Sequence, residues 1–525
     1  IEGGVDVILI ETVFDTLNCK AMIDAAFTMM KKRGVELPVM VSLTVSDLAG
    51  RTLSGQTIEA FLASLSPYPI FSVGMNCAFG APQMKPFIER MGKIAPYYIS
   101  AHPNAGLPNE MGAYDETPES MAPQIAEFID EGLVNIIGGC CGTTPDFIAR
   151  YAQMAEGKKP HVVTQRPQYM WLSGLDLLQV DDHVHAPIDS SRFVNVGERC
   201  NVAGSRKFLR LINEKSYEEA LGIARKQVAD GAAVVDVNMD DGLLDAKAEM
   251  VNFLNMIAAE PEIAKVPIMI DSSKWDVITA GLKCCQGKCI VNSISLKEGE
   301  EVFVAHAKDV LRYGAACVVM CFDEVGQATT FERRIEIAER AYHILVDQVG
   351  MNPLDIIFDP NVLAIATGME EHDNYAVDFI RATEWITTHL PGAHVSGGVS
   401  NLSFSFRGNT YIREAIHSVF LHYAQQKGMD FGIVNAKARM DYHKIPKEQL
   451  DIIEDVVLNR RKGAYEDLIE LAAEIKEKAD AAKAAKAGGA TVPKPAAPEW
   501  RKDSVENRLK YALRKGISDF LQVDI

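Results

Sequence analysis

Short apolar runs alternate with amphipathic stretches over most of the chain. From residue 192 onward, each β-branched run is followed by a polar tip and a helical stretch, and the unit recurs about every 30 residues. Eight such runs are present: 193–198, 233–240, 267–273, 289–295, 315–322, 355–361, 394–401 and 431–436. Eight successive strand–helix units predict an α/β fold, with a complete (β/α)8 TIM barrel over 192–445.

The first 157 residues show the same rhythm with fewer units. Five apolar runs precede residue 157: 5–12, 37–44, 70–77, 97–101 and 134–139. They predict a truncated (β/α)8 barrel over 1–157, of which three units are missing. The chain opens without an initiator Met, so we expect a fragment whose first units precede residue 1. Such a sheet would have unpaired edges and low stability in isolation.

The remaining segments lack the strand–helix rhythm. Residues 158–191, with prolines at 160, 167 and 187, have no clear periodicity and predict a connector. A helical extension is expected over 446–478, followed by an Ala/Lys/Pro linker over 479–498. Residues 499–525 resume an amphipathic helix from about Ser504, which we interpret as the start of a further helical module.

Composition and charge exclude several classes of protein. The chain has 525 residues with 53 Lys and Arg against 71 Asp and Glu, a formal charge of −18, which argues against a nucleic-acid partner. No apolar run approaches the roughly 18 residues of a membrane helix, and no signal peptide is recognisable, so we expect no membrane partner. Ten irregularly spaced cysteines are too few for a disulfide scaffold and favour a reducing, cytoplasmic location.

Three cysteines are candidates for a metal site in the first region. Gly-Gly-Cys-Cys-Gly-Thr at 138–143 follows one predicted strand, and Cys77 ends another. Parallel strands end on one rim, so Cys77, Cys140 and Cys141 are expected to converge there. Three thiolates and one open position are typical of catalytic zinc, which would ionise a bound thiol substrate. Cys284, Cys285 and Cys289 also resemble a metal cluster, but they lie between a helix and a strand, on the stability face of a barrel, and we interpret them as structural.

Other residues of the first region could contact a substrate. Glu11, at the tip of the first strand, is placed to hold a substrate ammonium group, although a loop-capping carboxylate is the alternative. Asn76 directly precedes Cys77 and is the second candidate contact. His102 could line the same pocket or be a structural histidine.

The second region carries acids and amides at its predicted strand ends. Asp271, Asn292 and Asp359 lie on three different strands, so they can surround one ring. Asn401 and Arg407 belong to the loop after the seventh strand. A rim rich in Asp and Asn and poor in basic groups suits a heterocycle with several N–H donors better than a phosphate. Any single polar strand end could instead be a generic feature of a barrel.

Six segments together resemble cobalamin-dependent methionine synthases over essentially the whole chain. Besides residues 138–143, they are Ala-His-Pro-Asn-Ala-Gly-Leu-Pro-Asn at 101–109, Arg-Thr-Leu-Ser-Gly-Gln-Thr at 51–57, Asn-Val-Gly-Glu-Arg at 195–199, Ile-Asp-Ser-Ser-Lys-Trp at 270–275 and Gly-Gly-Val-Ser-Asn-Leu-Ser-Phe-Ser-Phe-Arg-Gly at 397–408. The resemblance implies a homocysteine barrel, a barrel for 5-methyltetrahydrofolate, and the start of a cap over a cobalamin domain of the same polypeptide.

The resemblance also assigns roles to residues. It implies that Cys77, Cys140 and Cys141 bind Zn²⁺, with L-homocysteine sulfur as fourth ligand, and we expect Glu11 and Asn76 to contact that substrate. The implied folate contacts are Asn201, Gly204, Asp271, Asn292, Asp359, Asn401, Arg407 and Arg413, with Asn401 near N5 of the pterin and Asp359 and Asn401 as the catalytic pair. The family moves a methyl group from folate N5 to cobalamin and then to homocysteine.

Two departures from the family pattern qualify this interpretation. Leu43 stands where the family is expected to have Gly, and its side chain could crowd homocysteine. The chain also ends at Ile525 before any Asp-x-His-x-x-Gly cobalamin ligand motif, so we expect it not to complete the cycle alone. The alternatives are a stand-alone pterin-dependent corrinoid methyltransferase, a dihydropteroate synthase relative, or a non-catalytic fragment.

Overall fold

The computed structural model describes residues 1–166, 168–181, 193–437, 440–488 and 504–515. Parts of the predicted connector, linker and C-terminal helical stripe, at 182–192, 489–503 and 516–525, lie outside the described residues. The chain divides into two compact units, Ile1–Tyr465 and Glu466–Ile525. None of the helices in the described ranges is both long enough and apolar enough to cross a membrane.

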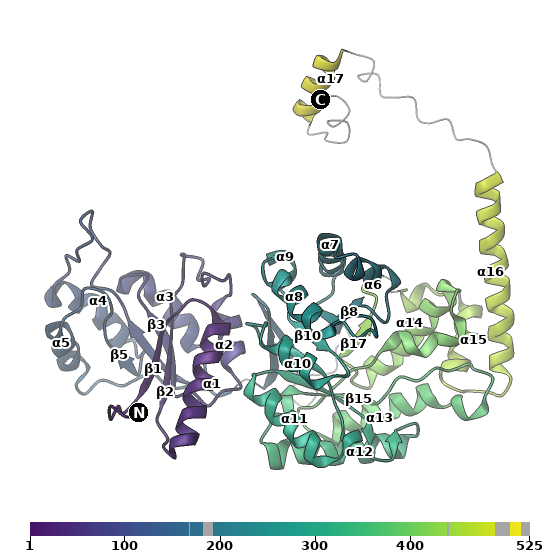
Figure 1. Ribbon diagram of the computed structural model, residues 1–525, viewed down its shortest axis with the longest axis horizontal. Helices are drawn as coiled ribbons and strands as arrows, with labels where there is room; N and C mark the ends of the chain where they lie inside the picture. The colour runs from purple at the N-terminus through teal and green to yellow at the C-terminus, as the bar shows by residue number, and fades with distance from the viewer. Residues whose placement is uncertain (167, 182–192, 438–439, 489–503, 516–525) are drawn as a thin grey trace. The chain divides into compact units, whose positions relative to one another are not determined.

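The first region is an open parallel sheet of five strands in the order β1-β2-β3-β4-β5 (Figure 1). Its strands are β1 (Ile8–Val13), β2 (Val39–Leu43), β3 (Ser72–Asn76), β4 (Tyr98–His102) and β5 (Ile136–Ile137), and its helices are α1 (Thr16–Arg33), α2 (Ile58–Leu65), α3 (Ala81–Gly92), α4 (Pro118–Asp130) and α5 (Pro145–Ala155). Every residue of β2 and β3 is buried, as expected where helices cover both faces of a parallel sheet. The five predicted strands are therefore confirmed.

Local signals explain where these helices begin and end. The Asp15 side chain accepts a hydrogen bond from the Asn18 N–H and starts α1, which ends at Gly34 with φ at 65°. Thr117 and Ser120 form a reciprocal capping box at the start of α4. Both ends of α1 and the start of α4 are therefore fixed by local sequence signals.

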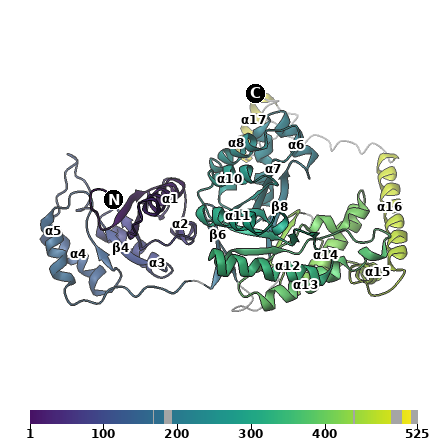
Figure 2. The same cartoon turned by 60° about the horizontal axis from the view of Figure 1, so that its bottom comes forward.

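The second region is a parallel barrel of eight strands (Figures 1 and 2). The strand order is β16-β15-β12-β11-β10-β9-β8-β17, and a parallel bridge between Gly398 and Ile433 closes the ring. The strands are β8 (Val194–Asn201), β9 (Val234–Asn238), β10 (Ile268–Asp271), β11 (Ile290–Ile294), β12 (Ala316–Met320), β15 (Ile356–Asp359), β16 (His394–Val395) and β17 (Phe431–Val434). All eight match predicted runs, so the predicted TIM barrel is confirmed.

Helices surround this barrel. They are α6 (Arg206–Asn213), α7 (Tyr217–Ala229), α8 (Ala246–Ala258), α9 (Pro261–Ala264), α10 (Trp275–Leu282), α11 (Glu300–Arg312), α12 (Phe331–His343), α13 (Tyr375–His389) and α14 (Thr410–Gln426). A short ribbon, β13 (Phe322–Asp323) and β14 (Gly326–Gln327), follows β12. Farther along the chain lie α15 (Lys447–Val457), α16 (Ala464–Gly488) and α17 (Val505–Lys515), so α16 continues into the segment expected to be a linker.

The segment expected to be a plain connector contains an antiparallel hairpin, β6 (Tyr169–Ser173) and β7 (Leu177–Asp181). Met170, Leu172 and Val180 of this hairpin belong to the same buried cluster as apolar residues of the barrel strands. The hairpin therefore forms part of the barrel core, and the expectation of a connector without regular structure was wrong for these residues.

The open sheet and the barrel are joined by polar contacts. The Ser64 and Ser173 hydroxyls lie 2.9 Å apart, and the Gln56 amide donates to the Gly174 carbonyl at 3.0 Å. Arg312 of α11 makes two hydrogen bonds to Asp24 of α1, at 2.6 and 2.8 Å. We refer to the contacts between residues 1–66 and the hairpin or barrel as the seam.

Candidate functional site

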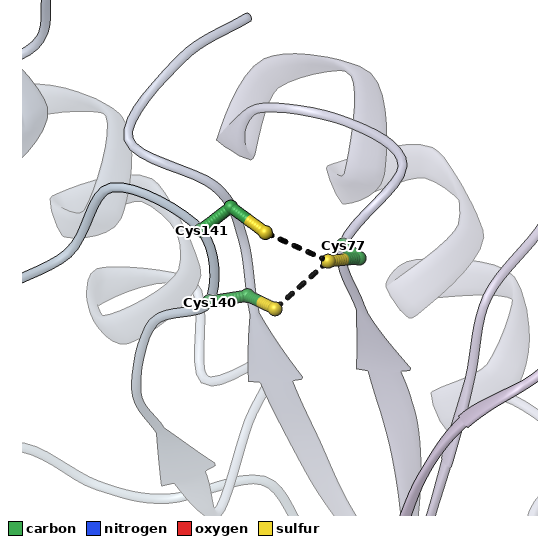
Figure 3. A group of neighbouring side chains, drawn as sticks. All are labelled: Cys77, Cys140 and Cys141. Atoms are coloured by element: carbon green, nitrogen blue, oxygen red, sulfur yellow. Dashed lines mark hydrogen bonds between the residues drawn. The ribbon is translucent and has the colours of Figure 1, made fainter. Parts of the chain in front are cut away.

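Three cysteine side chains meet at the ends of two strands of the open sheet. Cys77 follows β3, and Cys140 and Cys141 lie in the loop after β5 (Figure 3). The Cys77 sulfur lies 2.9 Å from that of Cys140 and 3.4 Å from that of Cys141, and all three sulfurs are within 4.8 Å of one another. It is the one cluster of metal-ligating side chains found among the residues that the structure describes. The structure thus brings together the three cysteines predicted from the sequence.

The backbone around these thiols is unusual. Cys77 and Ala78 both have left-handed φ values, 59° and 60°, which are costly for residues with a Cβ. A Cβ at Gly139 would lie 2.4 Å from the Thr143 methyl group, so the turn before the Cys pair requires glycine there. Strain of this kind persists only where the surroundings hold it, and here it directs the sulfurs toward one point.

Hydrogen bonds fix the loop that carries the Cys pair. The Cys140 N–H donates to the Pro103 carbonyl at 2.9 Å, and the Cys141 N–H donates to the Asn104 side chain at 3.2 Å. The Thr143 hydroxyl donates to the Cys140 carbonyl at 2.7 Å. The segments 101–109 and 138–143, which carried much of the sequence resemblance, therefore support each other across the strand ends.

Contacts among the three thiols shift the pKa values of Cys77 and Cys141 in opposite directions. Burial and hydrogen bonds to the other two thiols raise the pKa of Cys77 to about 12, whereas a hydrogen bond from Cys77 lowers the pKa of Cys141. A tetrahedral Zn²⁺ with Zn–S bonds of about 2.3 Å holds its sulfurs about 3.8 Å apart. The sulfurs of this cluster, all within 4.8 Å of one another, lie in that range. The donor set and its geometry fit zinc.

The predicted homocysteine contacts lie beside this cluster in different roles. Asn76 is buried, accepts from the Thr12 N–H at 2.9 Å, donates to the Thr12 hydroxyl at 2.8 Å and approaches the Cys140 sulfur at 3.6 Å. Glu11 is exposed and acts electrostatically on His102, whose pKa is lowered by burial. Leu43 lies in the hydrophobic core with no exposed surface. Of these residues, Glu11 is therefore the one whose side chain a ligand can reach from solvent.

Tyr114 is a site residue that the sequence reasoning missed. Its hydroxyl group is hydrogen-bonded to the Cys141 thiol, and its ring lies over Gly142, where a Cβ would be 2.5 Å from the tyrosine Cβ. It comes from an irregular loop between β4 and α4, so no strand register pointed to it. The only signal was its closeness in sequence to the segment 101–109.

The barrel aligns its polar strand ends in one row. Asn201, Asn238, Asp271 and Asn292 are successive register partners across β8, β9, β10 and β11. Asp359 ends β15, where it pairs with Met320 of β12. The predicted residues Asp271 and Asn292 are thus direct neighbours, and Asp359 lies two strands beyond Asn292.

Burial raises the pKa values of these carboxyl groups. It raises the pKa of Asp271 to about 6 and that of Asp359 to about 7. Burial also raises the pKa of Asp236, helped by the charges of Asp271 and Glu198, and the pKa of Glu198 itself. Carboxyl groups that titrate near neutrality can both accept and donate hydrogen bonds to a ligand. Asp236 was missed from the sequence, where its signal is a lone acid inside the apolar run 234–237.

Asp359 is held by a strained turn. It accepts the N–H of Asn361 at 2.8 Å, and Asn361 has a left-handed φ of 68°. The Asn361 amide donates to the Cys321 carbonyl at 2.8 Å, while the fully buried Arg334 donates to the Pro360 carbonyl at 2.7 Å. The end of β15 is therefore rigidly fixed from two sides.

The remaining predicted folate residues lie in two loops. In the loop after β8, Asn201 accepts the N–H groups of Ala203 and Gly204 at 2.9 and 3.0 Å. After β16, Arg413 donates to the Ser403 hydroxyl and the Ser400 carbonyl, and the Ser400 hydroxyl donates to Glu198 at 2.8 Å. Asn401 is exposed in this second loop, and Arg407, also exposed, stacks on the Phe404 ring with 4.4 Å to its centroid. Arg413 and Asn201 therefore shape loops, whereas Asn401 and Arg407 are open to a ligand.

Two known families match this chain, one over the open sheet and the other over the barrel. Residues 1–155 match the family model of homocysteine S-methyltransferase, and residues 197–435 match that of pterin binding enzymes. The chain thus contains a domain of each kind, and the cysteine cluster falls in the first and the row of acids and amides in the second.

Solved structures similar to this chain include dihydropteroate synthases. That from Thermus thermophilus, solved with 6HMPPP, shares 20% identity and a TM-score of 0.36, covering 55% of this chain and 99% of its own. That from Xanthomonas albilineans with 7,8-dihydropteroate shares 17% identity and a TM-score of 0.35, covering 47% and 89%. That from Yersinia pestis with a pterine-sulfa conjugate shares 16% identity and a TM-score of 0.34, covering 53% and 94%.

Proposed function

We propose that this chain, with a homocysteine S-methyltransferase domain and a pterin-binding domain in succession, is part of a cobalamin-dependent methionine synthase. In this proposal it binds 5-methyltetrahydrofolate in the barrel and L-homocysteine at the cysteine cluster. The observation that carries the proposal is the three-thiol cluster at the strand ends of a domain that precedes a pterin-binding barrel in the same polypeptide.

The homocysteine side rests on the thiol cluster. Cys77, Cys140 and Cys141 would hold Zn²⁺ and leave one position for the substrate sulfur. Bound zinc would supply a Lewis acid that keeps the substrate thiol ionised at neutral pH. The exposed carboxylate of Glu11 would attract the substrate ammonium group, and Asn76 would position Cys140 through the 3.6 Å approach of its amide.

The folate side rests on the carboxyl and amide groups at the strand ends. Asp271 and Asn292 would accept and donate hydrogen bonds along the edge of the pterin ring. Release of a methyl group from N5 requires that this nitrogen gain positive character, because a tertiary amine is a poor leaving group. Asp359, with a pKa of about 7, can supply a proton to the ring system at neutral pH, and the exposed Asn401 would contact the ligand near N5.

Cobalamin enters the proposal through the sequence resemblance. In this interpretation cobalamin carries the methyl group between the two sites, and a cobalamin domain of the same polypeptide holds it. No residue of the described chain is assigned to that cofactor, so this part stays a prediction.

Calorimetry with 5-methyltetrahydrofolate on the whole chain tests the folate site. We expect binding to one site, weakened at least about tenfold by Asp271→Asn, since each lost hydrogen bond to a charged group is worth about 1.5–3 kcal/mol. Asp276→Asn, five residues after the strand end and exposed, is the matched control and should bind normally. Absence of binding, or equal binding by both variants, would overturn the folate assignment.

Metal analysis tests the thiol cluster and separates the proposal from its alternatives. We expect one tightly held zinc per chain, lost in Cys140→Ala and kept in Cys284→Ala, whose sulfur lies outside the cluster. With Co²⁺ in place of zinc, homocysteine should shift the thiolate absorption bands. A stand-alone pterin enzyme or a non-catalytic fragment needs neither the metal nor the response to homocysteine.

A further inference from the structure

A second group of thiols lies at the seam, away from both sites described above. Cys284, Cys285 and Cys289 occupy the loop between α10 and β11, at the start of a barrel strand rather than at its end. Lys20 of α1 reaches this loop and donates to the Gly287 carbonyl at 2.7 Å, with the Cys285 carbonyl at 3.5 Å. The Lys20 residue is only 8% exposed.

The charge of Lys20 is poorly compensated. Both of its hydrogen-bond acceptors are neutral carbonyl groups, and burial lowers the pKa of Lys20. The thiols of Cys289, Cys285 and Cys19 oppose this lowering, whereas the ammonium of Lys288 adds to it. Lys288 has its own carboxylate, since its Nζ lies 2.6 Å from Asp355. A buried ammonium without an anion is costly, so an ionised thiol beside Lys20 stabilises it.

The thiol best suited to ionise is Cys289. A hydrogen bond from Cys285 lowers the pKa of Cys289, with help from the charge of Lys20, and the same hydrogen bond raises the pKa of Cys285. Both residues also line the same small cavity, so a thiol with a lowered pKa and a thiol with a raised pKa border one space. This is the arrangement of a nucleophilic and a resolving cysteine.

A small cavity gives access to these sulfurs. It has a volume of about 50 Å³ and is lined by all three loop cysteines together with apolar residues such as Leu254 and Ile257. That volume exceeds the roughly 10–15 Å³ that one water molecule needs, so a hydroperoxide of similar size can enter. Of these cysteines, Cys284 and Cys285 are partly exposed, whereas Cys289 is buried.

We propose that Cys285 and Cys289 form an oxidation-sensitive dithiol, which a hydroperoxide converts into an intrachain disulfide. The Cys289 thiolate attacks one peroxide oxygen, the O–O bond breaks, and the departing hydroxide takes a proton from solvent. The Cys285 sulfur then attacks the resulting sulfenic acid, the S–O bond breaks, and the Cys285 proton leaves with the oxygen as water. With hydrogen peroxide, two thiols are oxidised and one peroxide is reduced to two waters.

Oxidation also has a consequence for the seam. The disulfide removes the anion beside Lys20 and leaves that ammonium with carbonyl partners alone. The loop has no room to adjust, because a Cβ at Gly287 would lie 2.0 Å from the Ser173 carbonyl of the hairpin. We therefore expect the oxidised protein to unfold at a lower temperature than the reduced one.

Mass spectrometry of the whole, zinc-loaded chain tests the proposal. After treatment with hydrogen peroxide and alkylation of the remaining thiols, trypsin cuts after Lys283 and Lys288 and separates the two cysteines. We expect one cross-linked peptide pair joined through Cys285 and Cys289, and we expect dithiothreitol to remove it. Cys284→Ser should leave the pair intact, whereas Cys285→Ser should abolish it. Persistence of both thiols, or a bond through Cys284 instead, would overturn the proposal.

The role of Lys20 has its own test. Lys20→Met should slow disulfide formation about tenfold for each unit by which the pKa of Cys289 rises, because the thiolate is the reactive form. The rate at which iodoacetamide labels Cys289 in the unmodified protein, compared with the buried Cys317, gives a second measure that needs no variant. Labelling of Cys289 no faster than of Cys317 would contradict an ionised Cys289.

Discussion

At the scale of single residues, the barrel rim contains carboxyl groups whose pKa values are raised by burial. Asp359 is 7% exposed, and its pKa rises from an ordinary 3.8 to about 7, chiefly through burial and against the opposing influence of the Asn361 N–H and Arg334. Between those two values the folded protein keeps a proton that the unfolded chain has lost. Stability contributed by this group therefore falls as pH rises from about 4 to 7.

Asp359→Asn should consequently stabilise the protein at high pH and not at low pH. Asparagine keeps the oxygen that accepts the Asn361 N–H but cannot ionise. The gain should grow from near zero below pH 4 to at most about 4 kcal/mol above pH 7, at about 1.4 kcal/mol for each pKa unit. Unfolding by urea at pH 5, 6.5 and 8 measures it, with the exposed Asp276→Asn as control. A gain of the same size at every pH would show that Asp359 does not titrate in this window.

We predict that Tyr114 affects the zinc affinity of the cysteine cluster, although it is not one of the three ligands. Its hydroxyl supports Cys141 through a hydrogen bond, so Tyr114→Phe should make protons compete better with zinc for that sulfur. We expect zinc affinity to fall about tenfold, the lower end for loss of a ligand's supporting partner. Competition with a chromophoric chelator measures the change. Tyr98→Phe, at the opposite end of β4, should retain normal affinity, and equal affinity in both variants would exclude a supporting role for Tyr114.

The sequence was sufficient to predict that Cys77, Cys140 and Cys141 meet and that Asp271 and Asn292 lie close together, because each lies at or just after a run whose strand character is plain. The sequence was insufficient to single out Asp236 and Tyr114 as neighbours of these residues. The neighbours of Asp236, which include Asn292, Asp271 and Glu198, depend on register across three strands, and a single sequence does not contain that register. Residues that act through a partner are visible only once the partner is placed.

At the scale of secondary-structure elements, the hairpin was the main feature missed. The run Tyr169-Met170-Trp171-Leu172-Ser173 is buried at four of its five positions, so it lacks the alternation that marks a strand with one exposed face. A three-residue loop containing Gly174 was the available signal for a hairpin. The thirteen predicted strands of the two sheets were easier, since parallel strands flanked by helices follow a regular spacing.

Because the hairpin belongs to the barrel core, removing one of its apolar side chains should destabilise the whole barrel. Leu172 has no exposed surface and packs among the barrel strands, so Leu172→Ala should lower the free energy of unfolding by about 2–5 kcal/mol. Gln179→Ala on β7, which is exposed, is the control and should change it by less than about 0.5 kcal/mol. Thermal unfolding followed by circular dichroism compares the two. Equal stability of both variants would mean that the hairpin is a mere connector.

At the scale of the whole molecule, the seam joins the open sheet to the barrel through buried charges rather than through surface contacts alone. Lys288 and Asp355 form an ion pair of 2.6 Å in which the side chains are 2% and 4% exposed, and the Ser66 hydroxyl of the open sheet lies 3.4 Å from the same ammonium. Burial lowers the pKa of Lys288, which the carboxylate opposes. An ion pair this deeply buried is sensitive to the loss of one partner, since the other charge is left without compensation.

Asp355→Ala should therefore destabilise the protein by about 3–5 kcal/mol, whereas the double change Lys288→Met with Asp355→Leu should recover most of that loss. The double variant removes both charges and fills their volume with apolar atoms, so neither desolvation cost remains. Urea unfolding of the wild type, Lys288→Met, Asp355→Leu and the double variant gives the coupling between the two positions, and Asp355→Ala is measured beside them. If the double variant is as unstable as Asp355→Ala, the pair acts by fixing the geometry of the seam, and its charge is not the deciding property. Recovery in the double variant would instead show that packing alone can hold the open sheet against the barrel, which makes Lys20 the remaining buried charge on which the seam depends.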